Sequence, residues 1–141
     1  MKAEELMIGD IVRVNKDVSI KKGTIVKVRS IDGDRRFQEL TGCISCVAVD
    51  DIDEMTAGVW LAYIEPIPLT EEILENNGFT KHAYGYSYDM IKLHGNLTEN
   101  DTVYFTLCIC EKYIKVIYVH ELQHALRLCG IEKEIVLNPE T

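Results

Sequence analysis

Residues 120–124, His-Glu-Leu-Gln-His, carry the H-E-x-x-H pattern of zinc metallopeptidases. Two histidines spaced four residues apart on a helix lie on one face, so both imidazoles can bind one Zn²⁺. The glutamate between them would act as general base on a zinc-bound water. The chemistry that this spacing allows is therefore peptide hydrolysis, with His120 and His124 as metal ligands and Glu121 as the base.

The surrounding sequence disfavours a metal site. Arg127 lies one turn after His124 on the same helical face, where a permanent cation opposes a bound dication. The longer H-E-x-x-H-x-x-G-x-x-H pattern is absent, because Arg127 and Gly130 occupy its glycine and third histidine positions. No spacing favours any of the residues that could serve as a third ligand, which are His82, His94, Glu132, Glu134 and Glu140.

A helical wheel divides this segment into two faces. The apolar stripe, which we expect to face the core, consists of Leu122, Ala125, Leu126 and Cys129. The polar face consists of His120, Gln123, His124 and Arg127. We expect the polar face to be the solvated side of an amphipathic helix; the alternative is a zinc-binding face that looks into a cleft.

Two pairs of cysteines could also do chemistry. The C-x-x-C of Cys43 and Cys46 and the C-x-C of Cys108 and Cys110 supply enough thiolates for a structural zinc, and the first pair alone could be redox-active. Both pairs lie in predicted strands, where residues two apart share a face and residues three apart do not. We therefore expect buried free thiols, and leave open whether the four meet in space.

Three tyrosines and an acidic run are further candidates for binding. Tyr84, Tyr86 and Tyr88 alternate along a predicted strand, so their phenols would share one sheet face and form a candidate binding face. Cross-strand packing is the other role of such a ladder. The acidic run at residues 50–54 could bind a hard cation, but it lacks the spacing and the glycine of a calcium loop. We expect a solvated turn there.

The composition restricts the partners. The chain of 141 residues has a formal net charge of −8, which repels phosphate backbones and anionic lipid. Only Lys21-Lys22 and Arg35-Arg36 could form a basic patch, and both pairs lie in expected turns, so nucleic-acid binding is disfavoured. No uncharged run approaches the ~20 residues of a membrane span, and no signal peptide is recognisable. Five cysteines, an odd number, favour the reducing cytoplasm.

The elements that must position these residues form two groups. In residues 1–65, strands are predicted over 10–14, 24–31, 43–49 and 59–64, with turn sequences between them. A sheet of this size must curl or be covered. The pattern of residues 8–12 followed by 22–28 resembles the opening of an SH3-like barrel. We expect a small β-barrel or meander here.

Residues 66–141 predict an α+β subdomain after a joint at Pro66-Ile67-Pro68. Thr70 is expected to cap a helix over residues 70–77 that ends at Gly78. Gly130 is expected to end a second helix in a Schellman motif that places Ile131 against Leu126. The predicted class is α+β, an SH3-like barrel or meander followed by a small antiparallel sheet with two helices. The remaining elements are strands over 83–93, 102–109 and 112–119, a helix over 120–129 and a strand over 131–137.

Three stretches of the chain resemble a family of short proteins of unknown function from gut bacterial genomes, their phages and mobile elements. The stretches are LMIGD at 6–10, PIPLTEEIL at 66–74 with NGF at 77–79, and VHELQ at 119–123 with GIEKEI at 130–135. In that family the helix pattern centres on the positions of His120, Leu122 and Gln123, while Glu121 and His124 are not required. The resemblance implies a structural role for the shared residues and covers the two ends and the joint.

These observations lead to one expectation of function and two alternatives. We expect a non-enzymatic protein-binding or accessory module of phage or mobile-element origin, which acts in the cytoplasm on a protein partner and needs no cofactor. The first alternative is a minimal zinc metallopeptidase. The second is a nucleic-acid-associated protein with an SH3-like barrel.

Overall fold

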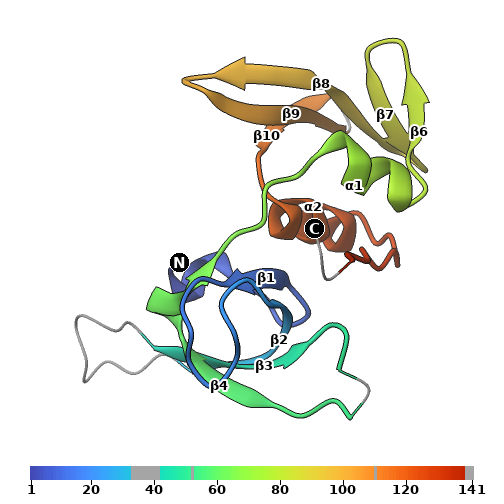
Figure 1. Ribbon diagram of the computed structural model, residues 1–141. Coiled ribbons are helices and arrows are strands. Elements are labelled where there is room, and N and C mark those ends of the chain that lie inside the picture. Colours follow the sequence, from blue (N-terminus) through green and yellow to red (C-terminus); the bar gives the residue numbers. More distant parts are fainter. Residues whose placement is uncertain (33–41, 52, 110, 139–141) are drawn as a thin grey trace.

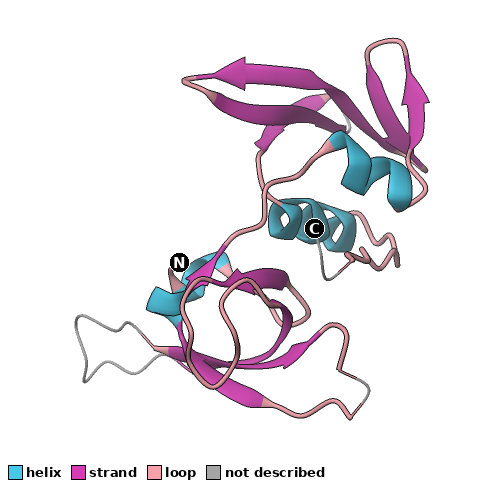
Figure 2. Ribbon diagram, in the orientation of Figure 1, coloured by secondary structure: helices cyan, strands magenta, loops and turns pink. Residues whose placement is uncertain are grey.

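The protein is built from two antiparallel sheets and two α-helices, as seen in a computed structural model that describes residues 1–32, 42–51, 53–109 and 111–138 (Figures 1 and 2). Each sheet has five strands. The longer helix, α2 (Val119–Leu128), lies between the two sheets. The predicted α+β class is therefore confirmed. None of the described helices is long and apolar enough to cross a membrane.

The first sheet curls upon itself (Figure 1). Its strand order is β4-β3-β2-β1-β5, and all pairs are antiparallel. The sequence predicted a single strand over residues 59–64. A short 3₁₀-helix (Leu61–Tyr63) instead separates the last two strands of this sheet. The strands are β1 (Ile11–Val14), β2 (Ile25–Asp32), β3 (Cys43–Ala48), β4 (Ala57–Trp60) and β5 (Ile64–Glu65).

The first strands, β1 and β2, are buried on both faces. Val12 and Val26 point into the curled sheet and pack in its own hydrophobic cluster. Ile11 and Ile25 point the other way and belong to the cluster of the second sheet and the helices. The continuous apolar run Ile11-Val12 thus reflects two cores that share one strand. All five strands of the first sheet precede residue 66, but its hydrophobic contacts cross that boundary.

The second sheet is a simple meander in the order β10-β9-β8-β7-β6. The prediction of one Tyr-rich strand over 83–93 is wrong, because Asp89 adopts a left-handed φ of 53° and the chain reverses there. The hairpin between residues 102–109 and the next strand is confirmed, but that strand ends at Val116. The strands are β6 (Thr80–His82), β7 (Gly85–Tyr88), β8 (Ile91–Glu99), β9 (Thr102–Ile109) and β10 (Lys112–Val116).

Both helices end as the sequence predicts. In α1 (Glu71–Asn76), the hydroxyl of Thr70 accepts a hydrogen bond from Ile73 N at 3.2 Å, and Gly78 leaves the helix with a φ of 82°. In α2, Gly130 has a φ of 68°, and the N–H of Ile131 donates to the carbonyl of Leu126 at 2.9 Å. This is the expected Schellman motif.

The predicted closing strand over residues 131–137 is wrong. The segment is extended, and Ile135 and Leu137 are buried, but it joins neither sheet. Its backbone pairs with a side chain instead. Asn77 Oδ1 accepts from Val136 N at 2.7 Å, and Asn77 Nδ2 donates to the carbonyl oxygen of Val136 at 3.0 Å. The amide group of Asn77 therefore satisfies the donor and the acceptor that a neighbouring strand would otherwise satisfy.

Candidate functional site

The polar face of α2 lies against the first sheet and is largely buried, contrary to our expectation of a solvated face. His120 and Gln123 are each only 6% exposed. The side chains of His124 and Arg127 retain 23% and 34% exposure. A helical wheel separates polar from apolar residues but does not identify what each side contacts. Here the segment Gly9–Ile11 supplies polar backbone groups and a carboxylate for this face.

Gln123 binds the start of β1 through its amide group. Its Oε1 accepts from Ile11 N at 2.9 Å, and its Nε2 donates to the carbonyl oxygen of Gly9 at 3.1 Å. Because β5 pairs with β1 only at Arg13 and Val14, this part of the β1 edge has no strand beside it. The side chain of Gln123 fills that position and satisfies two backbone groups.

Asp10 is a fully buried carboxylate at the centre of the contact. Its Oδ2 accepts from Met7 N at 2.8 Å and lies 2.6 Å from His124 Nε2. Its Oδ1 accepts from Arg127 NH1 at 3.1 Å. A carboxylate removed from water needs such partners, because its hydration is lost. Arg127, which we expected to oppose a bound metal, thus neutralises Asp10.

His120 lies deeper than His124. Its ring stacks on Tyr118 at a centroid distance of 5.8 Å and meets the ring of His124 edge-on at 5.5 Å. Burial lowers the pKa of His120 below its ordinary value, and the nearby His124 lowers it further; Asp10, Glu121 and Glu5 act in the opposite direction. Its buried Nδ1 has no hydrogen-bond partner among the residues that the structure describes.

Glu121 closes the first turn of α2. One carboxylate oxygen accepts from the backbone N–H groups of both Ile117 and Tyr118, each at 2.9 Å. The N–H of Tyr118, the N-cap residue, is one of the donors that a helix N-terminus leaves unsatisfied, and a carboxylate in the first turn also interacts favourably with the helix dipole. Within the described ranges, no group of three His, Cys, Asp or Glu side chains is arranged to hold a metal ion.

The cysteine pairs are split between the sheets. Cys46 is buried in β3, where burial raises its thiol pKa to about 11, and Cys43 lies on the opposite face of the same strand. Cys108 belongs to β9 of the second sheet, and Cys110 lies outside the described residues. A thiol with a raised pKa is a poor nucleophile and a poor ligand. Cys46 is therefore a packing residue.

The three tyrosines do not share one exposed face. Tyr84 lies in the turn before β7 and is exposed, whereas Tyr86 is buried and its hydroxyl donates to Glu75 at 3.0 Å. Tyr88 packs on Phe79 with ring centroids 5.3 Å apart. In the acidic run, of which Ile52 lies outside the described residues, the Asp51 carboxylate accepts from the N–H groups of Asp53 and Met55. Of the basic pairs, Lys21-Lys22 is exposed, and Arg35-Arg36 lies outside the described residues.

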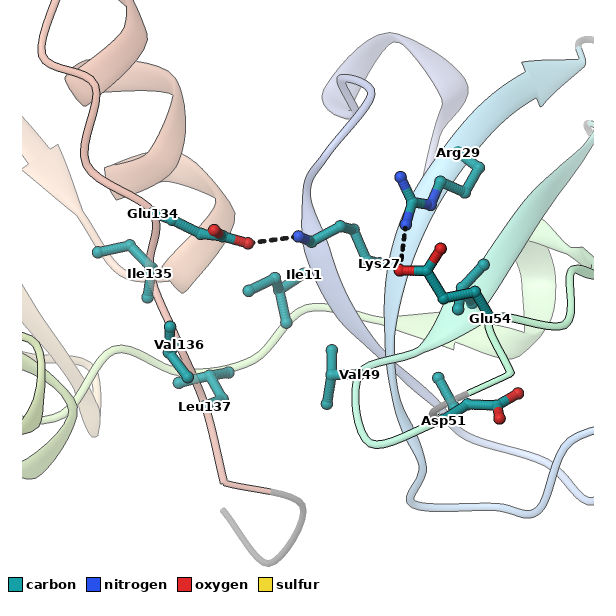
Figure 3. A pocket seen from close by; sticks show the side chains of 12 residues that line it. Ile11, Lys27, Arg29, Val49, Asp51, Glu54, Glu134, Ile135, Val136 and Leu137 are labelled. Atoms are coloured by element: carbon teal, nitrogen blue, oxygen red, sulfur yellow. Dashed lines mark hydrogen bonds and ion pairs between the residues drawn. The ribbon is translucent and has the colours of Figure 1, made fainter.

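A second contact between the two halves flanks a small hollow of about 160 Å³ (Figure 3). There Glu134, on the extended segment after α2, lies 2.5 Å from Lys27 of β2. This ion pair lowers the pKa of Glu134. Across the hollow, Arg29 pairs with Glu54 at 3.8 Å. Because these charges are already paired, the hollow offers little to a charged ligand.

An opening lined largely by apolar side chains lies between α2 and the second sheet, and we call it the α2–β10 groove. It has a volume of about 640 Å³. Leu128 at its rim is 85% exposed, and Ile114 is 53% exposed. The groove is lined by β9, β10 and α2, chiefly by Leu107, Ile109, Lys112, Ile114, Lys115, Ala125 and Leu128.

Comparison with known protein families, curated proteins and solved structures finds no match. The structure brings His120, Gln123, His124 and Arg127 together as predicted, and adds Asp10, which the sequence placed only at the start of a predicted strand. No sequence signal marked Asp10 as their partner, since 114 residues separate it from His124.

Proposed function

We propose that the protein is a non-enzymatic protein-binding module, of phage or mobile-element origin and active in the cytoplasm, and that it binds its partner at the α2–β10 groove. The observation that carries this proposal is the exposure of large apolar side chains at one opening. Leu128 and Ile114 both line the groove, and both are largely exposed. Exposed apolar side chains that gather beside a groove are typical of protein-binding surfaces.

The use of the HELQH residues in internal contacts supports the same proposal. Glu121 caps the helix, Gln123 binds β1, and His124 pairs with Asp10. A peptidase would need the carboxylate of Glu121 free to act on a zinc-bound water. In the conformation described, both acceptor contacts of that carboxylate are with the backbone of its own helix terminus.

We further propose that the curled first sheet is an SH3-like barrel that serves as a support. Ile11 and Ile25 of this sheet pack against the helix whose other side lines the groove. Since that helix is held from both sides, it presents Leu128 on a rigid element. Rigid presentation of a binding surface lowers the entropy cost of association.

Selection of short random peptides displayed on phage, against the purified full chain, tests the binding proposal. We expect selected peptides to bind in solution and to lose binding in Leu128→Asp. Met90→Asp is the matched control, because Met90 is also an exposed apolar residue, at 60%, and does not line the groove. Peptides whose affinity is unchanged by Leu128→Asp, or an absence of binders, would contradict the proposal.

The zinc metallopeptidase is retained as the second candidate, because the rings of His120 and His124 lie 5.5 Å apart beside a carboxylate. Its test is the metal content of protein purified without a metal-affinity tag, beside the His124→Ala variant. About one zinc per chain in the first and none in the second would establish a histidine site.

A nucleic-acid function is tested by retention on immobilised DNA, which must weaken as salt is added.

A further inference from the structure

The apolar face of the second sheet extends beyond the helix that covers it. Ile114 of β10 lies directly opposite Leu107 of β9. Leu107 is fully buried, and so is Val116, the next residue of β10 on the same face, but Ile114 is 53% exposed. Cover by α2 therefore stops at Ile114, and the rest of this face is the floor of the α2–β10 groove.

The groove runs along an edge strand. β10 is the last strand in its sheet, and no strand of the described ranges pairs with its outer side. A single bridge between Pro68 and Tyr118 closes the edge just after β10 ends. In an edge strand, alternate backbone N–H and C=O groups point away from the sheet and can pair with an added strand.

Among the described charged side chains at the groove, a positive one is left free to pair with a partner. Lys115 pairs with Glu99 and lies 4.5 Å from the centre of the Tyr104 ring. Lys112 forms no ion pair with any residue that the structure describes. Among the described residues that line the groove, the carboxylate of Glu121 is bound to backbone N–H groups and His124 pairs with Asp10. Although the chain has a net charge of −8, Lys112 thus makes the groove a local site that can attract a negatively charged group of a partner.

We infer that the occupant of the groove is an extended acidic segment of a partner protein, which pairs with the edge of β10 as an added strand. Alternate side chains of an added strand point to the same face. Apolar side chains of the segment would therefore contact Ile114 and Leu128, while an acidic side chain near one end would pair with Lys112. Main-chain hydrogen bonds supply affinity in this mode, and the side-chain contacts supply specificity. This inference rests on the groove being the binding surface proposed above.

Peptides selected on phage against the full chain test the inference. We expect them to alternate apolar with other residues and to carry excess Asp and Glu. Lys112→Glu should weaken their binding about tenfold, whereas Lys22→Glu, at an exposed lysine in the turn before β2, should not. N-methylation of every second peptide backbone nitrogen should abolish binding in one register and leave it intact in the other, because only alternate N–H groups face β10.

The outcomes separate this inference from the proposed function. Peptides that depend on Leu128 but are indifferent to N-methylation, are helical when bound, or carry no acidic excess would overturn the added strand and leave the groove as a binding surface. Peptides indifferent to Leu128 would overturn both. The oligomeric state of the free protein is measured by light scattering. If the wild type is a dimer and Ile114→Lys is a monomer, the edge of β10 binds a second copy of the chain and the inference of an acidic partner is overturned.

Discussion

The carboxylate of Asp10 and the imidazole of His124 lie 2.6 Å apart, although 114 residues separate them in the chain. Asp10 immediately precedes the first strand, and His124 belongs to the last helix. Their contact, with Arg127 on the other carboxylate oxygen, joins the beginning of the fold to its end. The residues that look most like a catalytic motif are thus part of the internal contact between the two sheets.

We expect Asp10→Asn to destabilise the protein by about 2–4 kcal/mol, because the change removes a buried carboxylate that accepts from Arg127 and Met7 N and lies against His124. The side chains of His124 and Arg127 are partly exposed, which limits the loss. Urea unfolding at neutral pH measures the effect. The exposed Asp53→Asn is the control and should change stability by less than about 0.5 kcal/mol. Equal effects of the two substitutions would show that Asp10 does not stabilise the contact.

Gln123→Glu should cost about 2–3 kcal/mol at neutral pH. A carboxylate can still accept from Ile11 N but brings a negative oxygen against the carbonyl of Gly9, where Nε2 now donates. Protonation restores a donor, and the folded state thereby raises the pKa of the new carboxyl. The folded variant then binds more protons than its unfolded chain, so its deficit relative to the wild type should shrink as the pH falls. A deficit that stays constant between about pH 7.5 and 5 would contradict the geometry.

His120 should make the wild type less stable in mild acid. Its pKa in the folded protein is below the ordinary value of about 6.5. The unfolded chain therefore takes up a proton that the folded protein does not, and stability declines as the pH falls through that value. The decline levels off below the folded pKa. The slope is at most about 1.4 kcal/mol per pH unit for one group.

His120→Leu should remove this part of the pH dependence, because leucine fills the buried site and does not titrate. His124 and Asp10 remain in both proteins, so the difference between the two stability curves reports on His120 together with its electrostatic coupling to these two groups. Parallel curves from about pH 7.5 to 5.5 would show that its burial has no energetic consequence.

Asn77→Ala should destabilise the protein by about 1–3 kcal/mol, since it leaves the part-buried N–H and C=O of Val136 and the carbonyl of Ile73 without this partner. Its neighbour Asn76 is exposed and provides a matched control, with an expected change of less than about 0.5 kcal/mol for Asn76→Ala. Hydrogen exchange of the Val136 amide gives a local readout. Undiminished protection in Asn77→Ala would mean that the segment is held by other contacts.

Local structure was predictable from the sequence wherever a short-range signal exists. Thr70 and Gly78 bound α1, and Gly130 ends α2, because caps act within one helical turn. The turn at Asp89 was missed, since nothing in Tyr86–Tyr88 indicates that a non-glycine residue will adopt a left-handed φ there. Aspartate tolerates that conformation but does not require it.

Long-range contacts were not predictable in the same way. The predicted strand over 131–137 has the alternation of a strand, with Ile135 and Leu137 buried, but its partner is the side chain of Asn77. The polar face of α2 was correctly delimited but wrongly assigned to solvent. A sequence pattern gives the direction in which Gln123 points; it does not give the backbone of Gly9 and Ile11 that it meets.

The position of Asn77 also affects how fast the Asn77-Gly78 dipeptide deamidates. Asn-Gly is the dipeptide at which deamidation is fastest in flexible chains, because the backbone nitrogen of the glycine attacks the side-chain amide and closes a succinimide ring. Here that nitrogen, of Gly78, donates to the carbonyl of Glu75 at 3.3 Å, and the amide of Asn77 is bound at both ends. Ring closure must wait until the end of α1 and the segment around Val136 have separated. The chemical lifetime of this site is therefore set by local opening of the fold, and anything that loosens the C-terminal segment will shorten it.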